Sequence, residues 1–541
     1  MSFYTFFKKN RPFFILTVGF LFWFGFLLVL SILNLREVVF LDGLASNPAT
    51  NVSSDYTSNH SFLRYLVEPF AGIAFIIGMD FYWLIAIIIF YIVFRIIYLI
   101  FKKFGRIRSI KYKKLMYPID SFMKFTFKMF SATIMIVGII FLIGYISLGY
   151  YFVSRYFMVI VQIGVRICSL ILLFKLAYVI IILLHPKLRL HYPMKSRKTF
   201  FKPNSTRFKF SKVFKRESIY MTGSVYLLLA ANILLISIPF PTHIIETDLR
   251  EDEFLIDFHV HTTMSDGWLL PEQRVAWYIE QGISGAFFTD HDTIRGATVA
   301  RKYVEKNNLD FIVWVGEEWT DNEKDIHINY YGLEEELVAP MSENPTGKPL
   351  ALNASDMIKY VKSNGGYVTV NHYNYDPNPS GGFGVPYTLE QLRSWGVDGF
   401  EIINGDHIQE QEIRQFSLNN NLICVGGSDI HTNEEVNAFV RLTLDDPTNK
   451  TVDNIFKNLR NNTHSVIMVD LYSNIAHFPG ELDDIGFEIF EDFINYIFNL
   501  NWLQVLSWIS WSCFGYVLLL FMYLKIKKTN LNFFKRKIVT K

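Results

Sequence analysis

Six long apolar runs constrain the fold of this chain more than any other feature. Each is about 20 residues long, the length of helix that crosses a bilayer. The runs lie at 13–33, 79–101, 129–153, 158–184, 218–240 and 501–524. Because no water reaches the bilayer core, such runs must satisfy their own backbone hydrogen bonds and fold as helices. With 51% of the 541 residues hydrophobic and 17% aromatic, a purely soluble protein is excluded. The sequence therefore predicts a multi-pass integral membrane protein with six spans.

Basic residues gather on one side of the predicted bilayer. Lys and Arg cluster before the first span, in the segments 102–114 and 195–216, and in the tail 525–541. With six spans all these clusters share one side, which the positive-inside rule assigns to the cytoplasm. We therefore expect cytoplasmic N- and C-termini, and the segment between spans five and six on the extracytoplasmic or lumenal side. One span more or fewer would reverse that side.

Three ionisable residues interrupt the apolar runs. Asp80 breaks the stretch 66–101, which fits a long helix, a re-entrant segment plus a span, or two short elements. The fourth span carries Arg166 and Lys175, and Asp80 is a candidate partner for either, because charges inside a bilayer face a cavity or a partner. The apolar and acidic segment 489–500 is expected as an interfacial helix or as a continuation of the last span.

The segment between spans five and six has a different pattern, in which residues of metal-binding types follow short apolar strands. In DFHVHTTMSDG, a spacing of two aims His259 and His261 to the same side of a strand. The segments FFTDHD, GEEWT, HINYYGL, NHY and GGSDIH follow apolar runs in the same way. The full set is His259, His261, Asp266, His291, Glu318, His327, His372, Asp429 and His431. Any single His among them fits an ordinary polar residue at a loop start, whereas an ordered set of nine favours an active site at the C-terminal ends of barrel strands.

Imidazole and carboxylate ligands together suit Zn, Mn or Fe. A bridging carboxylate holds two such ions roughly 3.5 to 4 Å apart, as two-metal hydrolases require. Nine ligands exceed one tetrahedral site, so we expect two or three divalent metal ions.

These segments resemble the PHP (polymerase and histidinol phosphatase) superfamily of metal-dependent phosphoesterases, over roughly residues 254–470. The resemblance implies an α/β fold, a distorted (β/α)7 TIM-like barrel inserted between helices of an all-α multi-pass transmembrane region. The similarity is nearest to the branch of stand-alone phosphoesterases and carbamate or ester hydrolases, whose bridging Glu lies two residues after a Gly. Gly316 therefore selects Glu318 rather than Glu317.

The resemblance also implies how the ligands divide among metals. The first metal would take His259, His261, Glu318 and Asp429, the second Glu318, His327 and His372, and the third Asp266, His291 and His431. Asp266 stands where many trinuclear relatives have His, which puts the occupancy of the third site in question.

The function implied is a membrane-anchored phosphoesterase that hydrolyses a phosphomonoester or a nucleotide-type phosphodiester through a metal-bridging hydroxide. Glu318, Asp429 and His259 are the expected catalytic residues, and some relatives act as 5′–3′ exonucleases or nucleoside bisphosphate phosphatases. One alternative is a carbamate or carboxylic ester hydrolase that uses the same metals. Another is a metal- or phosphate-binding membrane sensor without turnover, whose mark would be the loss of ligands.

Each of the further polar residues near the predicted ligands allows two interpretations. Asp290 and Asp292 either orient His291 or are solvated carboxylates of a turn. Arg295 and the cluster Asn404, Asp406 and His407 either contact substrate or cap the ends of elements.

Carboxylates outnumber Lys and Arg by about two to one between residues 250 and 480. This balance does not favour stable binding of a nucleic-acid duplex. We expect a small phosphoester, a nucleotide or a lipid-linked phosphate as substrate, because short linkers hold the site close to the bilayer. The expected domains are 1–245 with about five transmembrane helices, 246–480 as the PHP-like metallohydrolase, and 481–541 with the interfacial segment, last span and basic tail.

Overall fold

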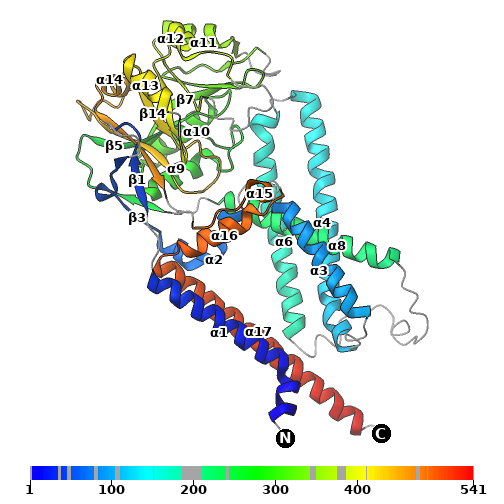
Figure 1. Cartoon of the computed structure of the whole chain (residues 1–541). Coiled ribbons are helices and arrows are strands. Elements are labelled where there is room, and N and C mark those ends of the chain that lie inside the picture. The colour runs from blue at the N-terminus through cyan, green and yellow to red at the C-terminus, as the bar shows by residue number, and fades with distance from the viewer. Residues whose placement is uncertain are drawn as a thin grey trace.

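The computed structural model describes residues 3–33, 38–45, 50–77, 83–103, 110–149, 152–184, 210–238, 243–340, 349–373, 385–409, 411–470, 475–483 and 485–539. It consists of an α/β part and a group of long helices (Figure 1).

Within the described residues, five helices are long and apolar enough to cross a membrane. They are α1 (Phe3–Leu33), α4 (Ile110–Leu148), α6 (Met158–Leu184), α8 (Phe210–Ile236) and α17 (Trp502–Val539). They coincide with five of the six predicted spans and are compatible with a membrane protein. The remaining span, 79–101, begins outside the described residues and continues as α3 (Trp83–Lys103), in which the apolar part Ile85–Ile97 is shorter. The sixth span, and the sidedness that depends on it, stay predictions.

Two helices at the opposite ends of the chain, α1 and α17, pack along each other (Figure 1). Trp23 Nε1 donates a hydrogen bond of 3.0 Å to Ser512 Oγ between them. The apolar stretch 66–101 forms two separate elements, α2 (Phe62–Ile77) and α3, and Asp80 lies outside the described residues.

Helix α16 (Glu488–Phe498) is separate from α17, since the chain leaves helical geometry between them. It packs on α2, and Tyr496 Oη donates a hydrogen bond of 2.6 Å to Glu68 Oε1. Of the two expectations for 489–500, the continuation of the last span is therefore wrong, because a distinct helix precedes that span.

Arg166 and Lys175 of α6 have partners among the described residues. Arg166 Nη2 donates to the carbonyl oxygen of Ser237 at 2.8 Å, just beyond the end of α8. The Lys175 ammonium lies over the rings of Phe125 and Tyr178, 5.5 and 5.1 Å from their centroids. Both cations thus take part in contacts between or within helices.

The α/β part is built on one large mixed sheet. Its strands follow the order β13, β12, β11, β8, β7, β6, β5, β15, β16, β1, β2, with β14 paired to β12. The strands are β1 (Val39–Asp42), β2 (Thr50–Asn51), β5 (Glu253–Val260), β6 (Gly285–Phe288), β7 (Ile312–Asp321), β8 (Ile326–Tyr331), β11 (Tyr367–Val370), β12 (Gly399–Asn404), β13 (His407–Ile408), β14 (Ile423–Gly427), β15 (Ala438–Thr443) and β16 (His464–Asp470). Two smaller sheets pair β3 (Thr57–Asn59) with β4 (Ile244–Glu246), and β9 (Leu337–Val338) with β10 (Leu350–Ala351).

The sheet contains two groups of parallel strands with one antiparallel strand between them. β5, β6 and β7 pair in parallel, as do β11, β12 and β14, while β8 runs antiparallel between these two groups. The α/β class is therefore confirmed, whereas the closed (β/α)7 barrel stays a prediction. Helices of this part are α9 (Pro271–Gln281), α10 (Arg295–Asn307), α11 (Ala354–Ser363), α12 (Leu389–Trp395), α13 (Gln411–Asn419), α14 (Val452–Arg460) and α15 (Gly480–Asp483).

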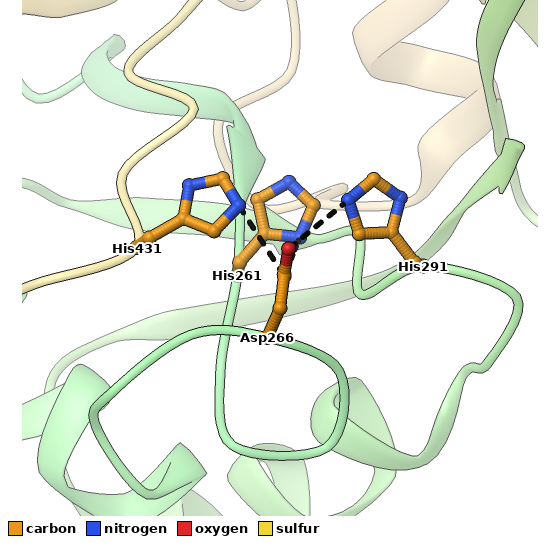
Figure 2. Close-up of side chains that lie close together, drawn as sticks. All are labelled: His261, Asp266, His291 and His431. Carbon is orange, nitrogen blue, oxygen red and sulfur yellow. Dashed lines mark ion pairs between the residues drawn. The ribbon is translucent and has the colours of Figure 1, made fainter. Parts of the chain in front are cut away.

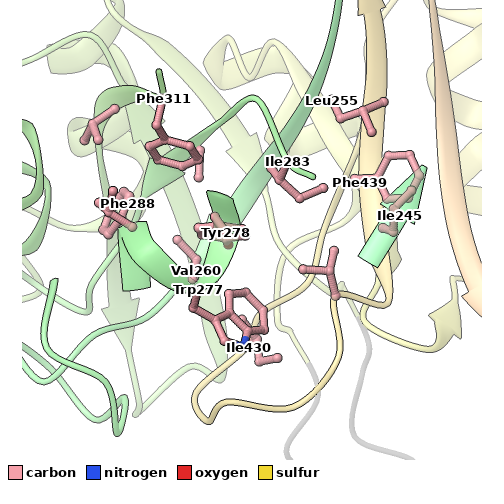
Figure 3. Close-up of a cluster of buried hydrophobic side chains, with 14 of the residues drawn as sticks. Ile245, Leu255, Val260, Trp277, Tyr278, Ile283, Phe288, Phe311, Ile430 and Phe439 are labelled. Atoms are coloured by element: carbon pink, nitrogen blue, oxygen red, sulfur yellow. The ribbon is translucent and has the colours of Figure 1, made fainter. Parts of the chain in front are cut away.

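A buried apolar cluster lies directly behind the strand ends that carry the predicted ligands (Figure 3). Val260 follows His259 and Ile430 follows Asp429, and both side chains are buried in this cluster with Trp277 and Phe288. Because His259 and Val260 are neighbours in the extended strand β5, their side chains point to opposite sides, and the burial of Val260 turns the His259 imidazole the other way.

A strand from outside the predicted range 246–480 completes the sheet. β1 pairs antiparallel with β16, in the register Val39 to Asp470. Phe40 is 1% exposed and stacks on Tyr56 with ring centroids 4.8 Å apart. The Arg414 guanidinium donates to the carbonyl oxygens of Gly43 and Leu44 at 2.8 and 2.9 Å. The segment after the first apolar helix is thus part of the folded α/β unit.

Replacing Phe40 with Ala should destabilise the α/β unit by about 3 to 5 kcal/mol, because the change leaves a cavity where a fully buried ring was packed. Thermal unfolding of the full chain in detergent measures the effect. Leu418→Ala, at a half-exposed position of α13, is the matched control and should change stability by less than about 1 kcal/mol. Equal losses in the two variants would contradict a structural role for β1.

Candidate metal centre

The structure brings all nine predicted residues together at one site, from six segments of the chain. His259 and His261 come from the end of β5, and both imidazoles are buried with their Nε2 atoms 3.1 Å apart. The prediction that these two side chains share one side of a strand is confirmed. Asp266 and His291 lie on the loops after β5 and β6, and His372, Asp429 and His431 lie beyond β11 and β14.

Glu318 of β7 occupies the middle of the site. Its Oε2 atom lies 3.1 to 3.2 Å from imidazole nitrogens of three residues, His259, His261 and His291. Its Oε1 atom lies 3.0 Å from His327 Nδ1 and 3.5 Å from His372 Nε2. Glu317 points elsewhere and accepts a hydrogen bond of 3.0 Å from the Leu337 amide. The two oxygens of Glu318 thus face different groups of imidazoles, as expected of a bridging carboxylate.

The ligand atoms form three overlapping groups. The first is His259, His261, Glu318 and Asp429, the set that the resemblance assigns to the first metal. In the second, His291 joins Glu318 and His327, and His372 lies nearby, with Nε2 3.9 Å from Asp429 Oδ2. In the third, His261 joins Asp266, His291 and His431. Figure 2 shows the carboxylate of Asp266 facing these three imidazoles, with its oxygens 3.3 Å from His431 Nε2 and 3.6 Å from His291 Nε2.

The donor set fits divalent cations. Imidazole nitrogens and carboxylate oxygens converge without a Lys or Arg among them, and such mixed N and O sets suit first-row metals. Glu318 Oε2 is also buried without a hydrogen bond of normal geometry to any residue that the structure describes. A buried carboxylate oxygen in this condition is costly unless a cation neutralises it.

The electrostatics of the site favour the charged forms of Glu318 and His259. Burial alone would raise the pKa of Glu318, but the imidazoles of His259, His291 and His327 hold that pKa well below its usual range. Burial alone would lower the pKa of His259, but the nearby carboxylates raise it well above its usual range. In contrast, burial and the charge of Asp292 raise the pKa of Glu317 well above its usual range, which favours its neutral form. Two neighbouring glutamates therefore have opposite charge preferences.

Two ligand residues have a positive backbone angle φ, which residues other than glycine rarely adopt. His372 has φ 23° and Asp429 has φ 49°. The amide of Asp429 donates to the carbonyl oxygen of His259 at 2.8 Å, and that of His372 donates to Glu401 Oε2 at 3.0 Å. Such backbones persist where surrounding contacts fix them, and they cluster at functional sites.

Sequence reasoning missed three buried polar residues that position the ligands. Glu401 of β12 lies with Oε1 3.2 Å from His259 Nδ1, and a carboxylate at this distance fixes the orientation of a metal-binding imidazole. Asn371 Nδ2 donates to Glu318 Oε1 at 2.9 Å. Asp257 of β5 accepts from the amides of His259 and Ser428, both at 3.0 Å. The signal for Glu401 and Asp257 was an acidic residue inside an otherwise apolar strand.

Three of the polar residues with two interpretations have contacts among the described residues. Asp290 is buried and accepts hydrogen bonds from the Thr262 amide and Ser265 Oγ at 2.7 and 2.9 Å, so it holds the loop after His261. Neither the solvated-turn reading nor direct contact with the His291 side chain describes it. Arg295 donates to Tyr156 Oη at 3.4 Å, and Asn404 Nδ2 donates to Asp429 Oδ2 at 3.2 Å.

Known proteins resemble this chain over part of its length. It is 34% identical over 84 residues to phosphoribosyl 1,2-cyclic phosphate 1,2-diphosphodiesterase of Eggerthella lenta, a match that covers 16% of this chain and 32% of that relative. It is 31% identical over 87 residues to the 5′–3′ exoribonuclease Rnm of Escherichia coli, which covers 16% of this chain and 30% of the relative. The chain thus spans about a third of the length of these curated relatives. No family model matches it.

Solved structures with similar descriptions share only a distant likeness. A two-domain protein of Bacteroides vulgatus, described as containing a predicted PHP-like metal-dependent phosphoesterase, is 21% identical. The match covers 40% of this chain and 66% of that chain, with a TM-score of 0.33. A putative metal-dependent phosphoesterase of Bifidobacterium adolescentis is 18% identical over 33% of this chain and 88% of that chain, with a TM-score of 0.26.

The ligand set and the curated relatives both support the resemblance to PHP phosphoesterases. The α/β domain is PHP-like. In this PHP-like domain Glu318, the two imidazoles at the end of β5 and Asp429 form one group, and their roles as metal ligands stay a prediction. Gly427, which ends β14, lies so close to β5 that a Cβ atom there would stand 2.3 Å from the Cβ of His259. Gly427 thus lets β14 and β5 approach and brings Asp429 to the imidazoles, whereas Gly426 lies against Val466 of β16.

Replacing Glu401 with Gln should lower the affinity of the PHP-like domain for Mn²⁺ by about 10- to 100-fold, because His259 loses the carboxylate that orients its ring. Titration of metal into the full chain in detergent measures this affinity. Glu412→Gln, on the exposed first turn of α13, is the isosteric control and should leave the affinity unchanged. An unchanged affinity in Glu401→Gln would remove Glu401 from the metal centre.

Proposed function

We propose that this protein is a membrane-anchored, metal-dependent phosphoesterase that hydrolyses a phosphomonoester or a nucleotide-type phosphodiester. The observation that carries the proposal is the position of Glu318 between two groups of imidazoles, with Asp429 completing the first group. The nine ligands would hold two or three divalent ions, of Zn, Mn or Fe. Names of the two curated relatives, a cyclic-phosphate diphosphodiesterase and an exoribonuclease, support phosphodiester substrates.

Bound ions would lower the pKa of water and neutralise the charge that develops on a phosphoryl group. The chain itself supplies the positions of the ions. Glu318 and Asp429 hold negative charge at the centre of the site, and Glu401 and Asn371 fix the orientation of His259 and Glu318. The PHP-like domain therefore needs no separate Ser or Cys nucleophile, and its only Cys, Cys424, is buried.

Two other functions fit parts of the same site. A carbamate or carboxylic ester hydrolase would use the same ligands, because metal-bound water attacks a carbonyl as well as a phosphoryl group. A sensor without turnover would tolerate the loss of ligands, whereas the full set converges here. The phosphoesterase remains the proposal, and the substrate panel below separates the three.

The full chain in detergent with Mn²⁺ or Zn²⁺ should hydrolyse para-nitrophenyl phosphate, dinucleotides or both, and act slowly on aryl carboxylic esters. Glu318→Gln should lower kcat/KM by about 100-fold or more, because a direct ligand matters at least as much as the residues behind it. Glu317→Gln is the adjacent control and should retain activity, since Glu317 favours its neutral form and faces away from the site. Activity on carboxylic esters alone would replace the proposal with the first alternative, and binding of metal without any turnover would replace it with the second.

We also propose that the PHP-like domain lies on the extracytoplasmic or lumenal side, with both termini in the cytoplasm. Support comes from the basic segments, which share one side if six spans are present. In sealed vesicles whose outer face is the extracytoplasmic one, added protease should cleave the PHP-like domain and spare a tag at the C-terminus. Permeabilised vesicles provide the control, in which both are cleaved. Cleavage of the tag with protection of the domain would reverse the orientation.

A further inference from the structure

The metal centre is open on one side, which is formed by the third group of ligands. The Asp266 side chain is 54% exposed, and those of His431 and His291 are 26% and 23% exposed. His259, His261 and Glu318, in contrast, are buried beneath them. Asp266 is the most exposed of the nine side chains, since those of His327 and Asp429 are each 22% exposed. The side of Asp266, His291 and His431 is therefore a route by which a phosphoryl group can reach the site.

One flank of this open side contacts the turn between two apolar helices. Helix α10 begins at Arg295, four residues after His291. The Arg295 guanidinium donates to Tyr156 Oη at 3.4 Å and lies 5.5 Å from the centre of the Tyr156 ring. Tyr156 belongs to a short π-helix, η2 (Val153–Phe157), which leads into α6. η2, the described part of the connection between α4 and α6 (here called the α4–α6 turn), thus reaches the α/β domain (Figure 1).

The other flank contacts the end of a third apolar helix. Asn433, two residues after His431, donates through Nδ2 to the carbonyl oxygens of Leu235 and Ile238 at the end of α8. The Leu235 hydrogen bond is 2.8 Å long. Unpaired carbonyls at the last turn of a helix are natural acceptors for such an amide. Both flanks of the open side therefore rest on the ends of helices that are long and apolar enough to span a membrane.

The apolar surface of these helices continues almost to the contacts with the domain. Ile143 and Ile146, in the last two turns of α4, are 61% and 75% exposed, and Ile163 near the start of α6 is 54% exposed. Exposed aliphatic side chains along a helix of this length are suited to lipid hydrocarbon. Ile146 precedes Tyr156 by only ten residues, so hydrocarbon-facing surface comes within a few turns of the residues that touch α10.

We propose that the substrate of this site is a phosphoester carried on an apolar chain that remains in the bilayer. Its phosphoryl group would reach Asp266, His291 and His431 between the α4–α6 turn and the end of α8. The acidic balance of the domain, with carboxylates in about twofold excess over Lys and Arg, is consistent with a small head group rather than a long polyanion. This inference rests on the proposed phosphoesterase function and narrows its substrate class.

Two chromogenic diesters that differ only in their tail test the proposal. The full chain, reconstituted in phosphatidylcholine vesicles with Mn²⁺, is assayed with hexadecyl para-nitrophenyl phosphate and with methyl para-nitrophenyl phosphate on both sides of the membrane. The kcat/KM for the hexadecyl diester should exceed that for the methyl diester by about tenfold or more, because a tail held in the same bilayer raises the effective concentration of the head group.

A pair of tyrosine variants separates this route from simple partition of the hexadecyl diester into lipid. Tyr156→Ala removes the contact with Arg295, and the ratio of the two kcat/KM values should fall by about threefold or more. Tyr145→Ala is the matched control on the same hairpin, where the ring stacks on Phe141, and should keep the ratio of the unmodified protein. Mn²⁺ titration shows whether each variant retains its metal centre.

Each of three further outcomes would overturn the inference, the route between the helix ends or the phosphoesterase function. Equal kcat/KM for the two diesters would overturn the inference and leave the phosphoesterase function intact. An unchanged ratio in Tyr156→Ala would assign the preference to partition alone and overturn the route between the helix ends. If neither diester nor the panel above is hydrolysed although Mn²⁺ binds, the phosphoesterase function itself fails, and the inference fails with it.

Discussion

The site depends on one buried carboxylate that faces imidazoles on two sides. Glu318 lies on a central strand, where water cannot solvate its charge, and the energy of an isolated charge in such a place is prohibitive. Five imidazoles around it offset that cost, and the elements that carry them are held in register by the sheet. The arrangement of β5 to β8 and β11 can thus be understood as a frame that delivers nitrogen atoms to both oxygens of a single side chain.

The ligands were predictable from sequence because local rules place them. A period of two puts His259 and His261 on one side of β5. Buried apolar residues follow four of the ligands and anchor them to the core, namely Val260, Trp319, Ile328 and Ile430. The choice of Glu318 over Glu317 came from family resemblance, and the structure gives its physical reason, since Glu317 meets the Leu337 amide on the opposite side of β7. That the nine residues bind metal remains a prediction, carried by their convergence.

Other features could not be predicted because they depend on contacts distant in sequence. Glu401 reaches His259 across 142 positions, and its place inside an apolar strand indicates a buried carboxylate without indicating which ligand it contacts. β1 pairs with β16 although more than 400 residues separate them, so a local pattern assigned the segment after the first span to the membrane region. Hydropathy predicted five of the spans directly, but the break between α16 and α17 depends on packing against α2.

The pairing of β1 with β16 joins two strands that the ribosome makes at different times. The ribosome completes Phe40 long before Val469, which it opposes in the sheet. At translation rates of about 5 to 20 residues per second, β1 waits for its partner for roughly 20 to 90 seconds. During that interval the edge of β1 that later pairs with β16 has unpaired backbone groups, a condition that favours aggregation between nascent chains. The folded domain thus pairs a strand that is synthesised early with a strand that is synthesised late, in one hydrogen-bonded ladder.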